Sequence, residues 1–190
     1  MDRCSTARGS VKVPQRIVPN ICVCHRRSGS DWKKKAGHDM IRRMEAGDLK
    51  EIGTLEQICF SMPWPEREFR NTIARQEYLY LVETQKEQIV GYGGLLMIGE
   101  EGDIISIAVR PECRNRQIGR RLLEELLQRG SAEGVSAFTL EVRVSNAPAI
   151  HLYKKAGFVP VGVRPGYYEK PREDALIMWK RQAVDGTITT

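Results

Sequence analysis

The residues best placed to do chemistry lie between Ile107 and Arg120, where an apolar stretch runs into a short basic turn and a leucine-rich segment. The periodicity predicts a strand over 104–109 that turns directly into a helix. Such a turn directs unpaired backbone N–H groups and the positive end of the helix dipole toward one place. This geometry suits a pyrophosphate, to which Arg114, Arg116 and Arg120 would add charge. The turn is neither a Walker A loop nor a G-x-G-x-x-G fingerprint, and an ordinary basic, solvent-facing turn is the alternative interpretation.

A second candidate group follows in the segment that a strand over 138–144 and the next helix would carry. Because side chains alternate along a strand, Glu141 shares one face with Arg143. Asn146 is of a type that starts helices, and Tyr153 lies on the apolar stripe of the helix that follows it. From the residues alone, Glu141 could be a surface carboxylate paired with Arg143, and Tyr153 could be a core tyrosine.

An alternation of helices and strands must position these groups. Asp48 and Glu51 predict an acidic capping box for a first helix that ends near Cys59. Its apolar stripe is Leu49, Ile52, Leu55 and Ile58. Further helices are expected from Pro65, from Ile118 to a stop at Arg129-Gly130, and from Asn146 to Gly157. Strands are expected over 78–83, 88–97, 104–109, 138–144, 158–163 and 175–180, with a turn near 86–87. This order predicts an α/β fold with a mixed sheet.

Charge divides the chain into unequal parts. Residues 1–39 carry nine Lys and Arg against three Asp, so the totals of 30 basic and 24 acidic residues leave 21 of each in residues 40–190. We expect a basic, disordered extension over 1–39, in part an over-extended reading frame ahead of Met40. The catalytic domain is expected over 40–182 and a flexible tail over 183–190.

The same composition argues against several classes of protein. A domain without net charge has no basic field to steer a polyanion, so we expect no direct nucleic-acid binding. No run of about 18 apolar residues predicts a membrane helix and no secretory signal is seen, so a cytoplasmic monomer is expected. The five cysteines suggest no disulfide framework, and Cys22, Cys24 and His25 lack a fourth zinc ligand, so no metal is expected.

Several spaced motifs together resemble one family. The run from Leu140 to Phe158 reads L-E-V-R-V-S-N and then A-I-x-L-Y-x-x-x-G-F, and the order V-x-P, R-x-x-x-x-G precedes it. These motifs resemble the GNAT N-acetyltransferases, above all the bacterial branch that acetylates the N-terminal alanine of a small-subunit ribosomal protein. Pro63-Trp64, Arg164-Pro165-Gly166-Tyr167-Tyr168 and Glu173-Asp174-Ala175 agree further. The resemblance spans about residues 41–180 and implies the GNAT acyltransferase fold, a mixed central sheet flanked by helices.

The resemblance also implies a set of roles, with acetyl-CoA as co-substrate and a protein N-terminus, of a ribosomal protein, as acceptor. Glu141 would be the general base, acting through water, and Tyr153 the general acid that protonates the departing thiolate. The acceptor would lie against Trp64, Tyr167 and Tyr168. The residues that would hold acetyl-CoA are Ile107, Ala108, Val109, Asn115, Arg116, Gln117, Ile118, Gly119, Arg120 and Asn146. Gln117 departs from the family's signature, which has a glycine there.

The nature of the acceptor stays open at this level. An α-amine, with a pKa near 8, loses its proton more easily than a lysine with a pKa of about 10.4, which suits a single carboxylate base. Acetylation of lysine or of a small amine is nevertheless an alternative. So is a non-catalytic acyl-CoA-binding or ribosome-associated module. We interpret His151 as structural or exposed and Cys113 as incidental, since no plausible His–Asp pair supports it as a nucleophile.

Overall fold

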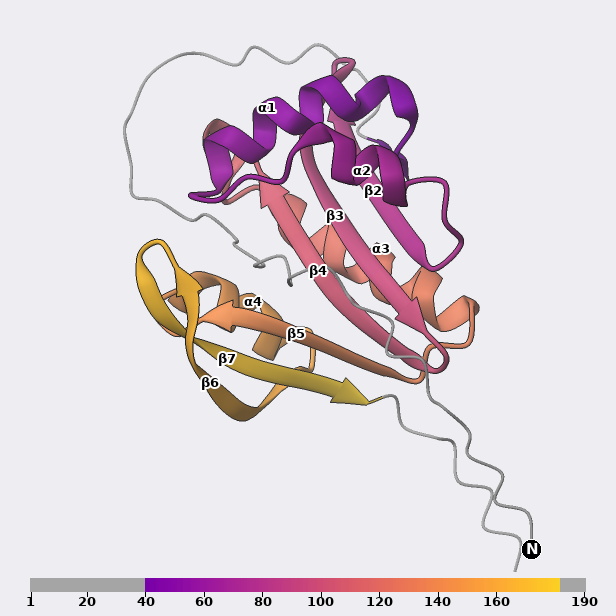
Figure 1. The fold of residues 1–190 in the computed structure, drawn as a ribbon. Coiled ribbons are helices and arrows are strands. Elements are labelled where there is room, and N and C mark those ends of the chain that lie inside the picture. The colour runs from indigo at the N-terminus through magenta and orange to yellow at the C-terminus, as the bar shows by residue number, and fades with distance from the viewer. Residues whose placement is uncertain (1–39, 182–190) are drawn as a thin grey trace, which may run out of the picture.

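The computed structural model describes residues 40–181, so the expectations for residues 1–39 and 183–190 lie outside the described part. Within it, the predicted mixed α/β sheet is confirmed, with the strand order β1-β2-β3-β4-β5-β7-β6 (Figure 1). The strands are β1 (Met40–Arg43), β2 (Tyr78–Gln85), β3 (Gln88–Ile98), β4 (Glu101–Val109), β5 (Ala137–Arg143), β6 (Val159–Glu169) and β7 (Arg172–Arg181). All neighbours are antiparallel except β4 and β5, which are parallel.

Helices cover both faces of this sheet, and each face has its own hydrophobic core (Figure 1). The helices are α1 (Leu49–Cys59), α2 (Glu66–Thr72), α3 (Ile118–Ala132) and α4 (Ala147–Lys155). On one face α1 and α2 pack against aromatic residues that include Tyr80 and Tyr92. On the other, α3 and α4 pack against Phe138 and Leu140 of β5. No helix among residues 40–181 is long and apolar enough to cross a membrane.

The sheet opens between its two parallel strands. Pairing joins only Glu101–Asp103 of β4 to Ala137–Thr139 of β5, and both strands then continue and diverge (Figure 1). The register between β3 and β4 shifts between Gly94 and Leu95, which leaves Ile105 as an extra residue in β4. A bulge of this kind bends its strand and increases the local twist. The predicted phosphate turn follows the end of β4, and Glu141 lies in β5 beyond the residues where the two strands pair.

The first helix has the predicted bounds, but two details of its prediction are wrong. The Asp48 side chain does not cap α1. Its carboxylate instead accepts a hydrogen bond from the N–H of Glu45 (2.8 Å), one turn earlier. Glu51 accepts from the N–H of Ile89 (3.1 Å) and pairs with Arg110 of the phosphate turn (2.8 Å). Ile58, placed in the apolar stripe, is 47% exposed, because the helix instead turns Glu56 and Cys59 inward.

Later elements depart from the expectation in two places. Arg129-Gly130 does not stop α3, which continues to Ala132, and the turn to positive φ comes at Gly134 (φ +94°). Gly130 is instead a buried helical residue at a close contact with the sheet. Residues 166–168, which lie outside the expected strands, belong to β6, whose register with β7 is irregular between Arg164 and Tyr168. The short edge strand β1 was not predicted, because four residues are too few to show an alternating pattern.

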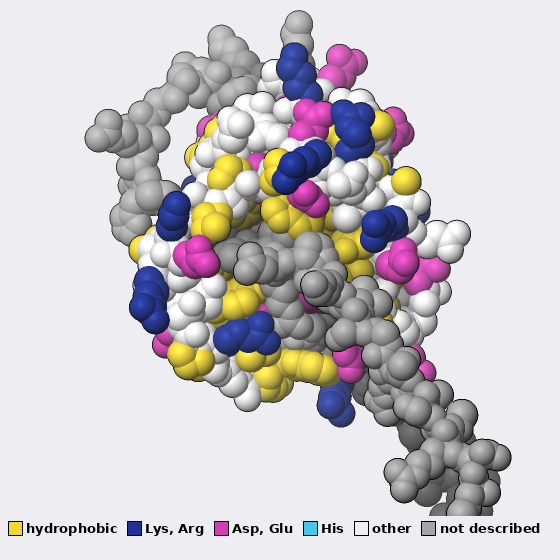
Figure 2. All heavy atoms as spheres, viewed as in Figure 1, with side chains coloured by type: hydrophobic (Ala, Val, Ile, Leu, Met, Phe, Trp, Pro, Cys, Tyr) yellow, Lys and Arg dark blue, Asp and Glu magenta, His cyan; other side chains and the backbone are white. Residues whose placement is uncertain are grey.

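The surface bears charges of both signs. Figure 2 shows Lys and Arg side chains interspersed with Asp and Glu side chains over the face that α1 and α2 cover. This distribution agrees with the equal numbers of basic and acidic residues in residues 40–190.

Two glycines inside helices, one in α1 and one in α3, differ in the space around them. A Cβ atom at Gly130 would lie 2.8 Å from Leu95 Cδ2 and 2.9 Å from Phe138 Cε1, whereas one at Gly53 of α1 would meet nothing within 4 Å. Alanine favours helix over glycine by about 0.5–1 kcal/mol, so we expect Gly53→Ala to stabilise the protein by that amount. Gly130→Ala should instead destabilise it by about 1–3 kcal/mol through overpacking. Urea denaturation of both variants measures the difference, and a stabilised Gly130→Ala protein would contradict this account of the packing.

Candidate active site

The predicted phosphate turn joins the end of β4 to the start of α3. After Val109 comes a short 3₁₀ turn, Pro111–Cys113, and then Asn115 and Gln117 both adopt left-handed backbone conformations with φ of +61°. Alternation of this kind directs successive N–H groups toward one side and forms an anion-binding concavity. Gln117 is the N-cap of α3 but makes no side-chain capping bond, and the helical ladder begins with Arg121 N–H on Gln117 O (3.0 Å).

Three N–H groups at the start of α3 therefore have no partner within the helix, namely those of Ile118, Gly119 and Arg120. The fifteen-residue helix adds the positive end of its dipole at the same point. Buried Glu83 of β2 pairs with Arg121, whose guanidinium also donates to the carbonyl of Arg116 (3.0 Å). This contact ties the turn to the sheet, so that its N–H groups are held in place.

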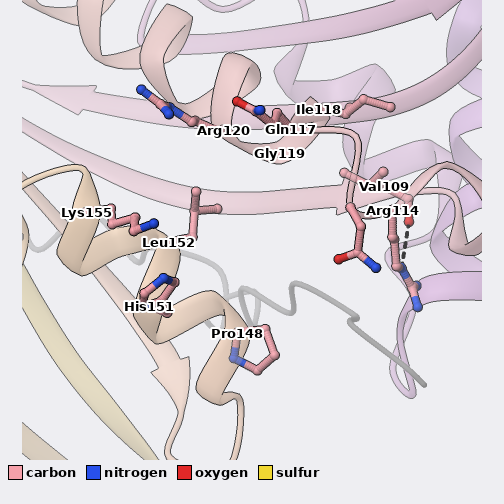
Figure 3. Close-up of a pocket in the computed structure, with 11 residues that line it drawn as sticks. Val109, Arg114, Gln117, Ile118, Gly119, Arg120, Pro148, His151, Leu152 and Lys155 are labelled. Atoms are coloured by element: carbon pink, nitrogen blue, oxygen red, sulfur yellow. Dashed lines mark hydrogen bonds between the residues drawn. The ribbon is translucent and has the colours of Figure 1, made fainter. Parts of the chain in front are cut away.

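A cavity of about 450 Å³ lies between the start of α3 and the facing side of α4 (Figure 3). Its size is within the range of small-molecule sites. The predicted residues that line it are Val109, Asn115, Gln117, Ile118, Gly119 and Arg120. Arg114, Arg120 and Lys155 supply its charged side chains, and none of its eleven lining residues is acidic. The cavity therefore suits an anionic group such as a pyrophosphate.

The part of this cavity that α4 supplies was not predicted from the sequence motifs. Pro148, His151, Leu152 and Lys155 face α3 across the cavity (Figure 3). Their spacing is that of one helical face, which could have indicated a shared surface. His151 is exposed, as expected, but it also belongs to the cavity wall. The predicted cofactor residue Arg116 is exposed and is not among the lining residues.

Backbone groups of β4 line the gap toward β5. Arg110 N–H donates to Val90 O of β3 (2.9 Å), so the alternation of the ladder turns the backbone groups of Ile107 and Val109 the other way. The Val109 carbonyl accepts from Arg114 Nε (3.2 Å, Figure 3) and from Cys59 Sγ (3.5 Å). The side chains of Ile107 and Ala108 are fully buried, so only their backbone can meet a ligand. Asn146 caps α4 as predicted, through Ala149 N–H (3.3 Å).

Glu141 is buried on the face of β5 that looks toward α1 and α2. Phe138 and Leu140 point into the core beneath α3 and α4, so alternation turns Glu141 to the opposite side. It is only 4% exposed, and its carboxylate pairs with Arg164 Nη1 of β6 at 3.3 Å. The interpretation of Glu141 as a surface carboxylate paired with Arg143 is therefore wrong. A buried carboxylate at this position can accept a proton from a group that binds beside it.

Tyr153 approaches from the other face, where it is fully buried on α4 against Phe158 (ring centroids 5.7 Å apart). Its hydroxyl has no hydrogen-bond partner among the residues that the structure describes. Burial raises the pKa of Tyr153 above its ordinary value, so the phenol stays protonated at neutral pH. A buried hydroxyl without a partner is unusual and marks a group able to donate to a ligand.

A third buried residue, Tyr168 of β6, interacts with both of these residues. Its side chain is fully buried, and it is close enough to both Tyr153 and Glu141 to interact with them electrostatically. Burial is the main cause that raises the pKa of Tyr168, and Tyr167 raises it further. Tyr168, for which the resemblance implies a contact with the acceptor, is a buried residue of a bulged strand, and that contact stays a prediction.

Arg143 anchors the hairpin between β6 and β7. Its guanidinium donates to the carbonyls of Lys170 and Pro171 (both 3.0 Å), pairs with Glu173 (3.0 Å), and lies 4.1 Å from the centre of the Tyr168 ring. The Lys170 carbonyl also accepts from the Ser61 hydroxyl (2.5 Å). The segment between α1 and α2 is thus tied to the hairpin. Trp64, half-buried in that segment, packs edge-on against Phe69 (5.3 Å).

Two further candidate chemistries receive no support in the described residues. Cys113 is buried, and burial raises the pKa of its thiol above the ordinary value, which disfavours the nucleophilic thiolate. Within residues 40–181 no group of three or more His, Cys, Asp or Glu side chains could hold a metal ion. The Cys22, Cys24 and His25 group lies outside the described residues.

Comparisons with known proteins agree with this geometry. The acetyltransferase (GNAT) family matches residues 49–158. The chain is 35% identical over 140 residues to the ribosomal protein bS18-alanine N-acetyltransferase of Escherichia coli K12, a match that covers 73% of this chain and 94% of that protein. It is 33% identical over 142 residues to the enzyme of the same name from Haemophilus influenzae, covering 73% of this chain and 96% of that protein.

The solved structures show the same fold. The crystal structure of the ribosomal-protein-S18-alanine N-acetyltransferase from Escherichia coli superposes with a TM-score of 0.73 and 32% sequence identity, and the match covers 80% of this chain and 99% of that one. The family match spans more than half of this chain and includes the phosphate turn, Glu141 and Tyr153. The resemblance drawn from the sequence motifs is thereby confirmed, and the chain belongs to the GNAT family of acetyltransferases.

Proposed function

We propose that this chain transfers acetyl from acetyl-CoA to the N-terminal α-amine of a protein, with the N-terminal alanine of ribosomal protein bS18 as the acceptor. The observation that carries the proposal is the pair Glu141 and Tyr153, which approach the open end of the sheet from its two faces. Relatives matched over nearly their whole length are named for this acetylation, which supports the acceptor.

Acetyl-CoA would lie along the gap between β4 and β5. Its pyrophosphate suits the N–H groups of Ile118, Gly119 and Arg120 and the basic side chains around the cavity. Its pantetheine arm carries amides that match the outward backbone groups of Ile107 and Val109. This placement leaves the thioester near the residues at the end of β5.

The transfer needs two protons to move. The amine nitrogen attacks the thioester carbon, the C–S bond breaks, and an amide and a thiolate result. Glu141 takes the proton that the amine loses, through a water molecule, and Tyr153 gives its hydroxyl proton to the departing sulfur. Because burial raises the pKa of Tyr153, its hydroxyl carries this proton at neutral pH.

Acceptor identity can be tested by free CoA release. We expect rapid release with a peptide that begins with alanine and background release with the same peptide acetylated at its N-terminus. A third peptide, blocked at its N-terminus and carrying an internal lysine, separates α-amine from lysine acetylation, and mass spectrometry locates the acetyl group. Equal release with the blocked, lysine-containing peptide would overturn the N-terminal assignment, and absence of release with every peptide would favour a binding module.

The two proton-transfer roles predict different responses to pH. Glu141→Gln keeps the size of the side chain and removes the base, so kcat should fall by about 10²–10⁴-fold while acetyl-CoA affinity holds. Raising the pH from 7 to 9 should partly restore kcat, since more of the acceptor α-amine, with its pKa near 8, is then already neutral. Tyr153→Phe should lower kcat without such recovery, because the thiolate still lacks a donor. Folded variants with parental kcat from pH 6 to 9 would remove both assignments.

The left-handed backbone at Gln117 predicts that glycine at this position increases the stability of the protein. A left-handed conformation costs a non-glycine residue about 1–2 kcal/mol, so we expect Gln117→Gly to raise the melting temperature. Acetyl-CoA affinity should stay unchanged or improve, because the N–H groups of the turn are retained. Gln117→Ala keeps the Cβ atom and is the matched control, for which no gain is expected. Calorimetry and a binding titration measure both effects, and equal behaviour of the two variants would count against backbone strain.

A further inference from the structure

One buried carboxylate has no place in the acetyl transfer. Glu56, on the last turn of α1, is 1% exposed. One of its oxygens accepts a hydrogen bond from the Tyr92 hydroxyl of β3, and the other accepts from the backbone N–H of Trp64 (2.7 Å). The Tyr92 hydroxyl also contacts Ser106 Oγ of β4 (2.9 Å). Glu56 therefore joins the core of the sheet to the chain segment that carries Trp64.

That segment has few other attachments. Residues 61–64 belong to no helix or strand and connect α1 to α2. Among residues 40–181, two hydrogen bonds hold this segment: the Ser61 hydroxyl donates to Lys170 O, and the Trp64 N–H donates to Glu56. The first bond is exposed and the second is partly buried. The position of Trp64 thus depends on a carboxylate beneath it.

We propose that Glu56 is a positioning residue for the acceptor: it holds Trp64 through the backbone N–H and so fixes the wall of the acceptor groove that the α1–α2 segment forms. The inference rests on the proposed function and on the placement of the acceptor against Trp64 and Tyr167 that the family resemblance implies. Glu56 acts through Trp64 and does not touch the reacting atoms. Its loss should therefore weaken peptide binding and leave acetyl-CoA binding unchanged.

The surroundings of Glu56 make this hold depend on its charge. Tyr92 of β3, Tyr80 of β2, Ser106 of β4 and the Trp64 N–H face it, and no basic side chain of the described residues pairs with it. Burial raises the pKa of Glu56 to about 7, although the bonds from Tyr92 and Trp64 lower it. An N–H bond to a charged carboxylate is roughly twice as strong as one to a neutral carboxyl group. The hydrogen bond from the Trp64 N–H to Glu56 should therefore strengthen as Glu56 loses its proton.

Two substitutions distinguish the loss of the Glu56–Trp64 hydrogen bond from a general loss of stability. Glu56→Ala removes the acceptor of the Trp64 N–H, and we expect peptide KM to rise about tenfold or more, the equivalent of one charge-assisted hydrogen bond, with acetyl-CoA KM unchanged. The matched control is Tyr80→Phe, which removes a buried hydroxyl in the same core that bonds to Thr72 (3.0 Å) and not to the α1–α2 segment. It should lower the melting temperature and leave peptide KM as it was. Equal changes of peptide KM in both variants would overturn the proposal.

A neutral substitute for Glu56 gives a second readout that a purely structural role would not change. Glu56→Gln keeps the shape and an acceptor oxygen but cannot ionise. The ratio of its peptide KM to the parental value should be near one at pH 6, where Glu56 is mostly protonated, and should rise about threefold by pH 8. Titration of the peptide amine affects both proteins and cancels in the ratio. A ratio that stays constant across this range would contradict the proposed hold.

Hydrogen exchange tests the anchor without catalysis. The Trp64 amide should exchange faster in Glu56→Ala than in the parent or in Tyr80→Phe. If the parent acetylates no peptide, the proposed function fails, and the exchange measurement alone decides the role of Glu56. Faster exchange at Trp64 would then uphold the anchor, and unchanged protection would overturn it.

Discussion

The parallel pairing of β4 with β5 ends at the pair Asp103–Thr139, and the position of nearly every functional group follows from that early end. A bulge at Ile105 bends β4, and the strands separate before either has ended. Buried backbone N–H and C=O groups require partners, so two strands that part inside a sheet leave an edge that a ligand can complete. The start of α3 at the end of β4 and the start of α4 at the end of β5 place two helices beside this opening.

Four charged side chains are buried in the described part of the chain. The buried acidic and basic side chains of the described residues are Glu56, Glu83, Glu141 and Arg143. Each is held by hydrogen bonds or an ion pair, as a charge removed from water requires: Glu83 by Arg121, Glu141 by Arg164, Arg143 by Glu173, and Glu56 by Tyr92 and Trp64. These groups are costly to bury, and their contacts join the sheet to the segments that surround the gap. These contacts therefore hold segments that no strand pairing fixes in place.

The two ends of the site are linked through α1. Its last residue, Cys59, contacts the Val109 carbonyl, to which Arg114 of the phosphate turn also donates. One turn earlier, Glu56 holds Trp64 on the acceptor side. A single helix therefore contacts both the proposed cofactor end and the proposed acceptor end. A displacement of α1 would therefore move groups at both ends of the site.

The sequence by itself determined the elements whose signals are local. The bounds of α1, the start of α3 at Ile118 and the cap of α4 by Asn146 follow from periodicity and capping chemistry within a few residues, and the structure has all three. Motif order was sufficient to indicate the family. Positive φ at Gln117 was also foreseeable, because the family places glycine there.

Only the tertiary structure decided which distant residues meet. The partner of Glu141 is Arg164, from a strand more than twenty residues later, and Glu51, expected in a helix cap, instead contacts Ile89 and Arg110. Gly130 looked like a helix stop, yet it allows α3 to approach Phe138. In each case a long-range contact outweighed a local preference worth about 1 kcal/mol or less, because burial and pairing of whole side chains involve larger free energies. Local sequence patterns indicate the helices and strands. The free energy of packing these elements together determines which side chains meet in the site.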